Sequence, residues 1–447
     1  MQDYLTAKEI KAWQPYRDAP VPDARNSRLE HRLRGAGQWD DKQIASRRWA
    51  IGCVSLEITQ RCNLDCTLCY LSDNSESTPD LPIAEIFRRI DMIFDHFGAD
   101  ADVQVSGGEP TLRKPNELLA IVRRIVEKGM RASLFTNGIR ATRELLVQLA
   151  EAGLSDVAFH VDMTQQRQGY ASEAALNALR VEYIERARGL PLAVFFNTTI
   201  FAGNFHEIPV IVRWFSEHAD VVRLGSFQLQ ADTGRGVMRE REALITQRSV
   251  IEQIEQGART RLNFDAFNVG HSSCNKYAMA LVIDGNLYDA YDDPDLVVPL
   301  MRYSAGVSLP RTDRNAAVRA MLGVFARAPA LWWRGARYIA KKLWAARADL
   351  LRADGRVDKL TFVLHNFMDE RKLEHDRLEA CVFMVATGEG PLSMCLHNAK
   401  RDDYLWQPIQ LHIGKGQSAA KYLRGRARQA ALAARDIEPQ RIEARAR

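Results

Sequence analysis

The sequence lacks any uninterrupted apolar run of about 20 residues, the length that a helix needs to cross a bilayer. It therefore predicts no membrane-spanning helix. Met1 to Leu5 contain no basic stretch followed by an apolar one, so we expect no signal peptide. The chain also has no serine–histidine–aspartate or P-loop pattern, which leaves hydrolytic and nucleotide-phosphate chemistry without support.

Net charge is low as well. A formal charge of +5 over 447 residues is too small to indicate nucleic-acid binding. The basic residues are concentrated in two segments: 311–352 holds ten Lys or Arg against two Asp, and 414–447 holds nine against three acids. The rest of the chain is net acidic, so we expect local basic surfaces and no nucleic-acid partner.

Cysteine is scarce, and its seven residues do not suggest a disulfide framework. Three of them, Cys62, Cys66 and Cys69, form a C-x3-C-x2-C triplet. Three thiolates can hold three corners of a cubane iron–sulfur cluster, whereas electron-transfer clusters use four cysteines. The missing ligand would leave one iron open to a substrate. A zinc site is the alternative, but zinc motifs usually pair C-x2-C or histidine units. A labile cluster requires a reducing compartment, so we expect a cytoplasmic protein.

Strand and helix signals alternate six times between residues 51 and 240. Strands alternating with helices of about 10–15 residues predict βαβ units and a parallel sheet, and thus an α/β fold with an incomplete (β/α)6 barrel. We expect strands at 54–58, 103–106, 131–135, 156–161, 192–199 and 221–229, and helices at 83–97, 116–128, 142–152, 173–188 and 207–218. Chemistry in such barrels lies at the carboxyl ends of the strands. The cysteine triplet, Gly107-Gly108-Glu109 and Thr136-Asn137-Gly138 all fall there. Cys53 precedes the first strand, about 20 Å from the triplet, and is excluded as its ligand.

The remaining segments flank this barrel (51–240). Residues 1–50 are polar and interrupted by prolines, which predicts an extended N-terminal arm. Residues 241–310 form a bridging segment that contains Cys274, a helix at 241–259 and a hairpin over 277–291. Residues 311–352 are predicted as basic amphipathic helices, 353–412 as a small C-terminal unit with Cys381 and Cys395, and 413–447 as a basic tail that is helical from Ala419. The C-terminal half is thus expected to be an α+β extension.

The triplet together with Gly107-Gly108-Glu109 resembles the radical S-adenosylmethionine (SAM) superfamily over roughly residues 50–235. The resemblance implies a [4Fe–4S] cluster whose open iron is chelated by SAM. It implies a 5′-deoxyadenosyl radical that takes hydrogen from an unactivated carbon, and reduced flavodoxin or ferredoxin as the electron donor. Many members have an aromatic residue where this chain has Leu68, so the adenine contact is expected to differ.

The same resemblance implies six cofactor-binding positions. Gly107, Gly108 and Glu109 would lie beside the SAM amino group, and glycine permits a close backbone approach there. Asp162, at the end of the fourth strand, would meet the ribose hydroxyls, or it could equally be a loop or helix-capping carboxylate. The remaining two positions are Asn137 and Asn197.

A second, narrower resemblance lies in the C-terminal half. The runs at 364–369, 377–381 and 393–398, with Gly270-His271-x-x-Cys274, are similar to the archaeal tetraether lipid synthase and dihydropterin-type radical SAM methylase group. The resemblance implies carbon–carbon coupling or methylation, foremost of a lipid acyl chain and otherwise of a soluble molecule such as a pterin. The chain lacks the cysteine-rich amino-terminal extension of those relatives, which puts one metal site in doubt.

A second metal site is expected at Cys274, Cys381 and Cys395. Cys381 and Cys395 flank a glycine turn, so on a hairpin they would lie opposite each other, about 5 Å apart. Together with Cys274 they could ligate an auxiliary iron–sulfur cluster, with His271 or another group as a fourth ligand. The alternative is three unrelated buried cysteines, since free cysteine is common in protein cores.

Three questions stay open at this stage. The tryptophan-rich basic segment 316–351 is typical of helices at a membrane surface, but could equally be a helical layer that covers the open barrel. A peptide is a third substrate class, after the lipid and the small molecule. A non-catalytic iron–sulfur electron carrier is the alternative to an enzyme.

Overall fold

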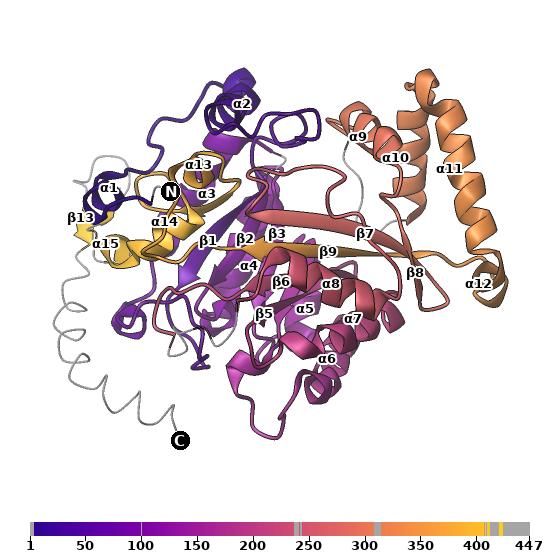
Figure 1. The fold of residues 1–447 in the computed structure, drawn as a ribbon. Coiled ribbons are helices and arrows are strands. Elements are labelled where there is room, and N and C mark those ends of the chain that lie inside the picture. The colour runs from indigo at the N-terminus through magenta and orange to yellow at the C-terminus, as the bar shows by residue number, and fades with distance from the viewer. Residues whose placement is uncertain are drawn as a thin grey trace.

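The structure, a computed structural model, describes residues 4–99, 101–236, 241, 244–307, 314–405, 407, 409–411 and 420–422. One large sheet organises these residues, with the strand order β11-β10-β1-β2-β3-β4-β5-β6-β9-β7-β8. Figure 1 shows β1 to β6 at its centre, with helices packed against their outer face. The predicted helix from Ala419 lies largely outside the described residues, but Ala420–Tyr422 form strand β13, paired with β12 (Ile409–Leu411).

The central strands are parallel, as the six strand–helix units predicted. Each covering helix has one apolar face, and α3, for example, buries Ile86, Ile90 and Ile93. The strands are β1 (Cys53–Thr59), β2 (Asp102–Gly107), β3 (Arg131–Thr136), β4 (Asp156–His160), β5 (Ala193–Ile200) and β6 (Val222–Leu229). The helices are α3 (Ile83–Phe97), α4 (Pro115–Glu127), α5 (Arg143–Glu151), α6 (Glu173–Ala187) and α7 (Ile208–Glu217).

Strands from the C-terminal half extend this parallel core on both sides. Strand β9 (Asp358–Asn366) pairs parallel with β6, and β10 (Phe383–Ala386) pairs parallel with β1. The short strand β11 (Pro391–Ser393) pairs antiparallel with β10. The sheet does not close, which confirms an incomplete barrel. Segment 353–412 is therefore not a separate unit, because its strands cover the open backbone edges of β1 and β6.

Strands β9 and β10 do not pair with each other, and side chains fill the space between them, which we call the seam. The rings of His365 on β9 and Phe383 on β10 meet edge to face, with their centroids 5.0 Å apart. Both rings also face the barrel interior. The seam is thus closed by packing rather than by backbone hydrogen bonds.

The N-terminal segment differs from the extended arm that its composition predicted. It contains α1 (Ala7–Ala12) and α2 (Arg25–Gly35), and α2 buries Leu29 and Leu33 in the main core. Arg32 of α2 donates a hydrogen bond to the carbonyl of Cys381 at 3.0 Å. An i, i+4 leucine pair is sufficient to dock a helix that is otherwise polar.

The predicted hairpin is confirmed as β7 (Asn275–Ile283) and β8 (Asn286–Asp289), joined by Asp284 and Gly285, both with positive φ. Helix α8 (Gln247–Ala258) covers only the C-terminal part of the range predicted for it, 241–259. Beyond the hairpin lie α9 (Pro294–Tyr303), α10 (Arg314–Ala326), α11 (Trp332–Ala345) and α12 (Arg347–Arg352).

Helices α10 to α12 do not cover the barrel. Figure 1 shows them grouped beyond the β7–β8 hairpin, away from β1 to β6. The helical-layer alternative for segment 316–351 is therefore wrong for the described residues. Nor is any helix of the described part of the chain long and apolar enough to cross a membrane.

Candidate active site

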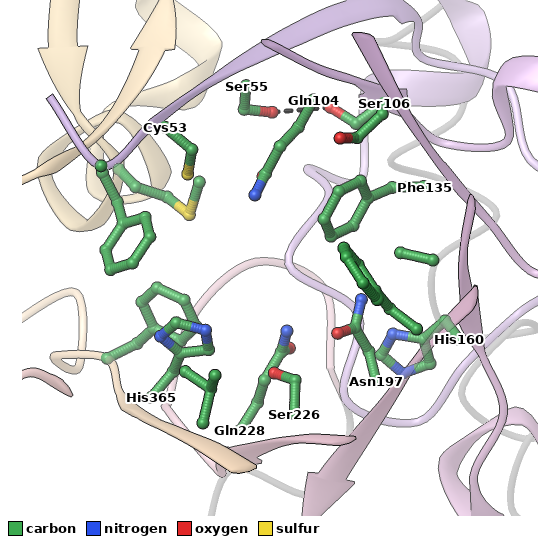
Figure 2. A pocket seen from close by; sticks show the side chains of 18 of the residues that line it. Cys53, Ser55, Gln104, Ser106, Phe135, His160, Asn197, Ser226, Gln228 and His365 are labelled. Atoms are coloured by element: carbon green, nitrogen blue, oxygen red, sulfur yellow. Dashed lines mark hydrogen bonds between the residues drawn. The ribbon is translucent and has the colours of Figure 1, made fainter. Parts of the chain in front are cut away.

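A cavity of about 640 Å³ occupies the barrel interior. Side chains from successive strands point into it, and Figure 2 shows Gln104, His160, Asn197, Ser226 and Gln228 facing one another around the space. At one end it is lined by Cys62, Cys66, Cys69 and Leu68 of the loop after β1, and by Gly107 and Gly108 at the end of β2. Cys53, at the opposite end of β1, also lines it. The predicted place of the triplet, at the carboxyl end of β1 and apart from Cys53, is confirmed.

The three thiols of the triplet lie within electrostatic reach of one another. Burial raises the pKa of Cys62 to about 11, and a nearby Cys69 adds to this. Burial and the neighbouring thiols also raise the pKa of Cys66. Without a bound cation these two groups are therefore protonated near neutral pH, whereas a metal cluster would bind them as thiolates.

Gly107 and Gly108 are required by contact with the start of the cysteine loop. A Cβ atom on Gly107 would lie 2.0 Å from the carbonyl oxygen of Thr59, and one on Gly108 would lie 2.2 Å from that of Arg61. The amide of Gly108 donates to Thr59 O at 3.0 Å, and the Tyr70 hydroxyl donates to Gly107 O at 2.6 Å. Only glycine permits this approach, which ties the end of β2 to the triplet.

The Glu109 carboxylate does not line the cavity, contrary to its predicted contact with the SAM amino group. Its side chain is fully buried, and it accepts hydrogen bonds from the Thr111 and Thr136 hydroxyls and from the Thr111 and Asn137 amides. It therefore orders the loops after β2 and β3. Asn137 does line the cavity, and its side-chain amide donates to Asn63 of the cysteine loop at 2.7 Å.

Asp162 likewise serves the loop that carries it. Its buried carboxylate accepts bonds from His160 Nε2 (2.7 Å), the Thr199 amide (2.7 Å), and the amide and hydroxyl of Thr164. A carboxylate has about four acceptor sites, so none is left for ribose hydroxyls. This arrangement supports the alternative in which Asp162 is a carboxylate that orders its own loop. Asn197, by contrast, points into the cavity (Figure 2), and its cofactor-binding role stays a prediction.

His160 is a cavity residue that the sequence analysis missed. Burial disfavours its charged form, but the Asp162 carboxylate outweighs this and raises the pKa of His160. Burial also opposes ionisation of Asp162, yet His160 and the other donors lower the pKa of Asp162 to about 2. The Asp162 carboxylate therefore favours the protonated form of the His160 imidazole at the cavity wall. The His-x-Asp spacing at the end of β4, which puts both residues on one face, was the available signal.

We expect this pair to make stability depend on pH. The pKa of His160 is raised above its ordinary value of about 6.5, so the stabilisation is complete below that pH and is lost as the pH rises through the raised value. Protonation of the Asp162 carboxylate would weaken the pair only in acid, well below pH 4. Replacing His160→Gln should therefore cost roughly 1 kcal/mol more of the unfolding free energy at pH 6 than at pH 9.

Chemical denaturation at the two pH values measures this difference. The exposed His206→Gln is the matched control. Equal losses at both pH values for His160→Gln would contradict the ion pair.

Arg235, in the loop after β6, was not identified as a site residue from the sequence. Its side chain is fully buried, and its guanidinium bonds to Glu76 at 2.8 Å and to the thiol of Cys69. Its backbone amide donates to the carbonyls of Cys69 and Leu71. Burial disfavours its charge, but Cys69 and Glu76 raise the pKa of Arg235. Arg235 is thus a fixed cation beside the triplet in space, although it lies 166 positions after Cys69 in the sequence. No local sequence pattern reveals this contact.

The other three predicted ligands form a second thiol group near the β9–β10 seam. The Cys395 thiol lies within electrostatic reach of Cys381 and Cys274, and these neighbours add to the burial that raises the pKa of Cys395 to about 12. Arg377 Nε donates to the Cys274 thiol at 3.2 Å. The predicted opposition of Cys381 and Cys395 on a hairpin is wrong, because Cys381 precedes β10 and Cys395 lies in helix α14 (Met394–Ala399), beyond the paired residues of β11.

Among the described residues, no three His, Cys, Asp or Glu side chains converge tightly enough to hold a single metal ion. A cluster of several irons takes ligands that lie further apart than those of one ion. His271 does not face the thiols as a free ligand: its Nε2 lies 3.3 Å from Asp376, and its Nδ1 accepts the amide of Ser273.

Comparison with known proteins identifies the barrel. Residues 56–214 match the model of the radical SAM superfamily. A 7,8-dihydro-6-hydroxymethylpterin dimethyltransferase of Methanocaldococcus jannaschii is 29% identical over 41% of this chain and 37% of its own length. An Fe-coproporphyrin III synthase of Methanosarcina barkeri is 32% identical over 46% and 51%, respectively. The chain thus spans about half or less of these relatives.

Among solved structures, Streptococcus suis SuiB bound to S-adenosylmethionine overlaps 42% of this chain and 43% of its own, with 14% identity and a TM-score of 0.34. The sequence match over β1 to α7 coincides with the strands that carry the triplet, Gly107 and Gly108. Residues 56–214 therefore form a radical SAM domain.

Proposed function

We propose that the protein is a radical SAM enzyme that methylates or couples an unactivated carbon of a compact polar molecule. The polar side chains in the middle of the cavity support this proposal. The Ser226 hydroxyl is buried, points into the cavity and has no hydrogen-bond partner among the described residues. The amides of Gln104, Asn197 and Gln228 face the same space. A polar substrate would satisfy these groups, whereas an alkyl chain would leave them buried and unpaired.

The residues around the triplet fit the expected cofactors. Cys62, Cys66 and Cys69 would hold the cluster at the cavity mouth, and the backbone at Gly107 and Gly108 would receive SAM. This pair of cofactors supplies a 5′-deoxyadenosyl radical when bound. The barrel wall and the His365–Phe383 seam enclose the substrate, which protects a reactive carbon from water. His160, whose protonated form Asp162 favours, would offer a proton donor on the same wall.

The relatives are consistent with such a substrate. The names of the two relatives above refer to a pterin and a porphyrin, and further relatives are a GTP 3′,8-cyclase and a PqqA peptide cyclase. Three of these four names contain a heterocyclic ring system. A ring of this kind would match amides and hydroxyls that project from several strands at once.

Substrate dependence tests the proposal. Anaerobic enzyme with reductant and SAM should form 5′-deoxyadenosine faster when given the polar metabolite fraction of a strain that lacks the protein. Asn197→Leu should reduce this stimulation about tenfold, because it removes a substrate hydrogen bond inside the cavity. Thr198→Val, the neighbouring buried position that does not line the cavity, is the control. Stimulation by the lipid fraction alone would contradict the polar substrate.

Arg235 should set the reduction potential of the cluster. A buried cation next to Cys69 favours the more negative, reduced state, so Arg235→Met should lower the midpoint potential by roughly 60 mV, a tenfold change for one electron. Arg235→Lys keeps the charge and should stay closer to wild type. A redox titration followed by electron paramagnetic resonance measures both. Identical potentials in all three proteins would rule out this role.

We also propose an auxiliary iron–sulfur cluster at Cys274, Cys381 and Cys395. Their mutual proximity supports it, as does Arg377, which could neutralise a thiolate charge. Reduced flavodoxin or ferredoxin remains the proposed electron donor. The three-unrelated-cysteines alternative predicts no second cluster, and iron analysis separates the two.

A lipid acyl chain is the second candidate substrate. One observation favours it: Met301 of α9 and Val307 just beyond it line the cavity, while Leu296 and Leu300 of α9 pack against the base of the tryptophan-rich helices. The cavity wall is thus connected to an apolar surface. The polar lining described above favours the small molecule.

A further inference from the structure

Helix α11 is apolar on two opposite sides. Its inner side packs on α9 and α10 through Gly335 and Tyr338, together with Leu331 just before the helix, and a Cβ on Gly335 would already lie 2.8 Å from Phe325. Its outer side is exposed and consists of Trp332, Trp333, Ile339, Leu343 and Trp344, which we call the docking face. At 100° per residue these positions share one broad arc of the helix.

The exposure of these side chains is unusual. Trp333 is 80% exposed, Trp344 70% and Trp332 56%. Large aromatic side chains normally bury much of their surface, so three exposed tryptophans on one helix indicate a contact that the isolated chain does not make. Exposed Val318 and Leu322 of α10 and Leu351 of α12 extend the apolar surface of this helical group. Figure 1 shows the group projecting beyond the sheet, where no other described element covers it.

The charge around the docking face is positive. Arg337 and Lys341 lie along one edge of the helix arc, and the Arg347 guanidinium stacks over the Trp344 ring at 4.3 Å. The acidic residue described on α10 to α12 is Asp349, and its carboxylate is held inward by Asn286 and Tyr288. Asp292, on the hairpin side, is likewise bound by Lys341 and Lys342.

We propose that the docking face binds the surface of an anionic lipid bilayer, with α11 lying in the plane of the interface. Tryptophan suits the boundary between headgroups and acyl chains, and lysine and arginine add attraction to anionic lipids. A second copy of the chain would bring like charges together around the same face, which disfavours self-association. The helix lies on the membrane rather than across it, because no described helix is long and apolar enough to span one.

Flotation of the full-length protein with vesicles tests this. We expect binding to phosphatidylcholine vesicles that contain about 30% phosphatidylglycerol, and loss of binding in high salt. Trp333→Ser/Trp344→Ser should weaken vesicle affinity more than about tenfold, since it removes two interfacial anchors. Arg337→Gln/Arg347→Gln should weaken it by roughly tenfold. Arg123→Gln/Arg248→Gln, exposed on barrel helices, should bind like wild type.

Light scattering of the same proteins without vesicles completes the test. The proposal is supported if the wild-type protein is a monomer that floats with anionic vesicles. The tryptophan variants should then fail to float while their thermal unfolding is unchanged. Absence of wild-type flotation, or equal flotation of all variants, overturns it. A wild-type dimer that the tryptophan variants convert to monomer also overturns it, because the occupant of the docking face is then a second copy.

Discussion

Replacing Cys62, Cys66 and Cys69 together by alanine should abolish SAM cleavage. The three thiols are the side chains placed to hold a cluster at the cavity mouth, beside Gly107 and Gly108. Without thiolate ligands the cluster cannot bind, and 5′-deoxyadenosine formation should fall to the level without enzyme. Anaerobic reconstitution followed by chromatography of the nucleoside products measures the loss.

The iron content of this variant separates the two metal sites. It should fall by about one four-iron cluster, and the iron that remains should disappear when Cys274, Cys381 and Cys395 are also replaced. Cys53→Ala, a buried thiol at the other end of β1, should retain the full iron content and serves as the control. A triple variant without any iron would exclude the auxiliary cluster, and one that still cleaves SAM would exclude the triplet as the cluster site.

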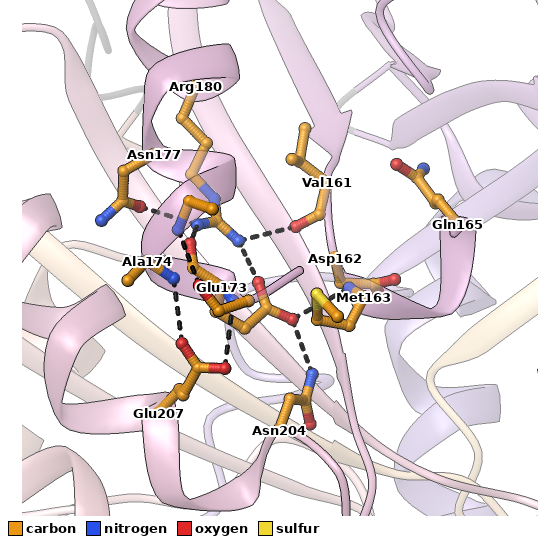
Figure 3. A network of polar contacts seen from close by, with 12 residues as sticks. Val161, Asp162, Met163, Gln165, Glu173, Ala174, Asn177, Arg180, Asn204 and Glu207 are labelled. Carbon is orange, nitrogen blue, oxygen red and sulfur yellow. Dashed lines mark hydrogen bonds and ion pairs between the residues drawn. The ribbon is translucent and has the colours of Figure 1, made fainter. Parts of the chain in front are cut away.

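Replacing Arg180→Met should destabilise the fold by about 3–5 kcal/mol, since it leaves a buried carboxylate without its partner. Arg180 and Glu173 are both completely buried on α6, and their side chains meet at 2.5 Å. Figure 3 shows Arg180 reaching the carbonyl of Val161, while Glu173 also accepts bonds from Asn204 and the Met163 amide. The pair therefore supports the loop that carries Asp162.

Urea denaturation gives the free energy of unfolding. Arg180→Met combined with Glu173→Leu should recover part of the loss, because the unpaired charge is removed with its partner. Arg248→Met is the matched control: Arg248 pairs with Glu252 on the exposed side of α8, and its loss should cost less than about 1 kcal/mol. A loss of similar size at both positions would show that burial of the Arg180 pair contributes nothing.

The sequence by itself determined the barrel core and the place of the triplet. Apolar strands alternate there with helices of one-sided hydrophobicity, and these periodicities are local properties of the chain. They also located Gly107, Gly108 and Asn137 at the carboxyl ends of strands. The hairpin of β7 and β8 followed from Asp284 and Gly285, whose backbone preference is equally local.

Tertiary structure alone decided which distant segments meet. Strand β9 and strand β10 extend opposite edges of one parallel core, and no periodicity states which edge a strand will join. The same holds for Arg235, whose contact with Cys69 depends on the packing of two loops. The carboxylates of Glu109 and Asp162 turned away from the cavity because nearby amides and hydroxyls compete for them. Hydrogen-bond partners are chosen by three-dimensional proximity, which residue type and spacing do not encode.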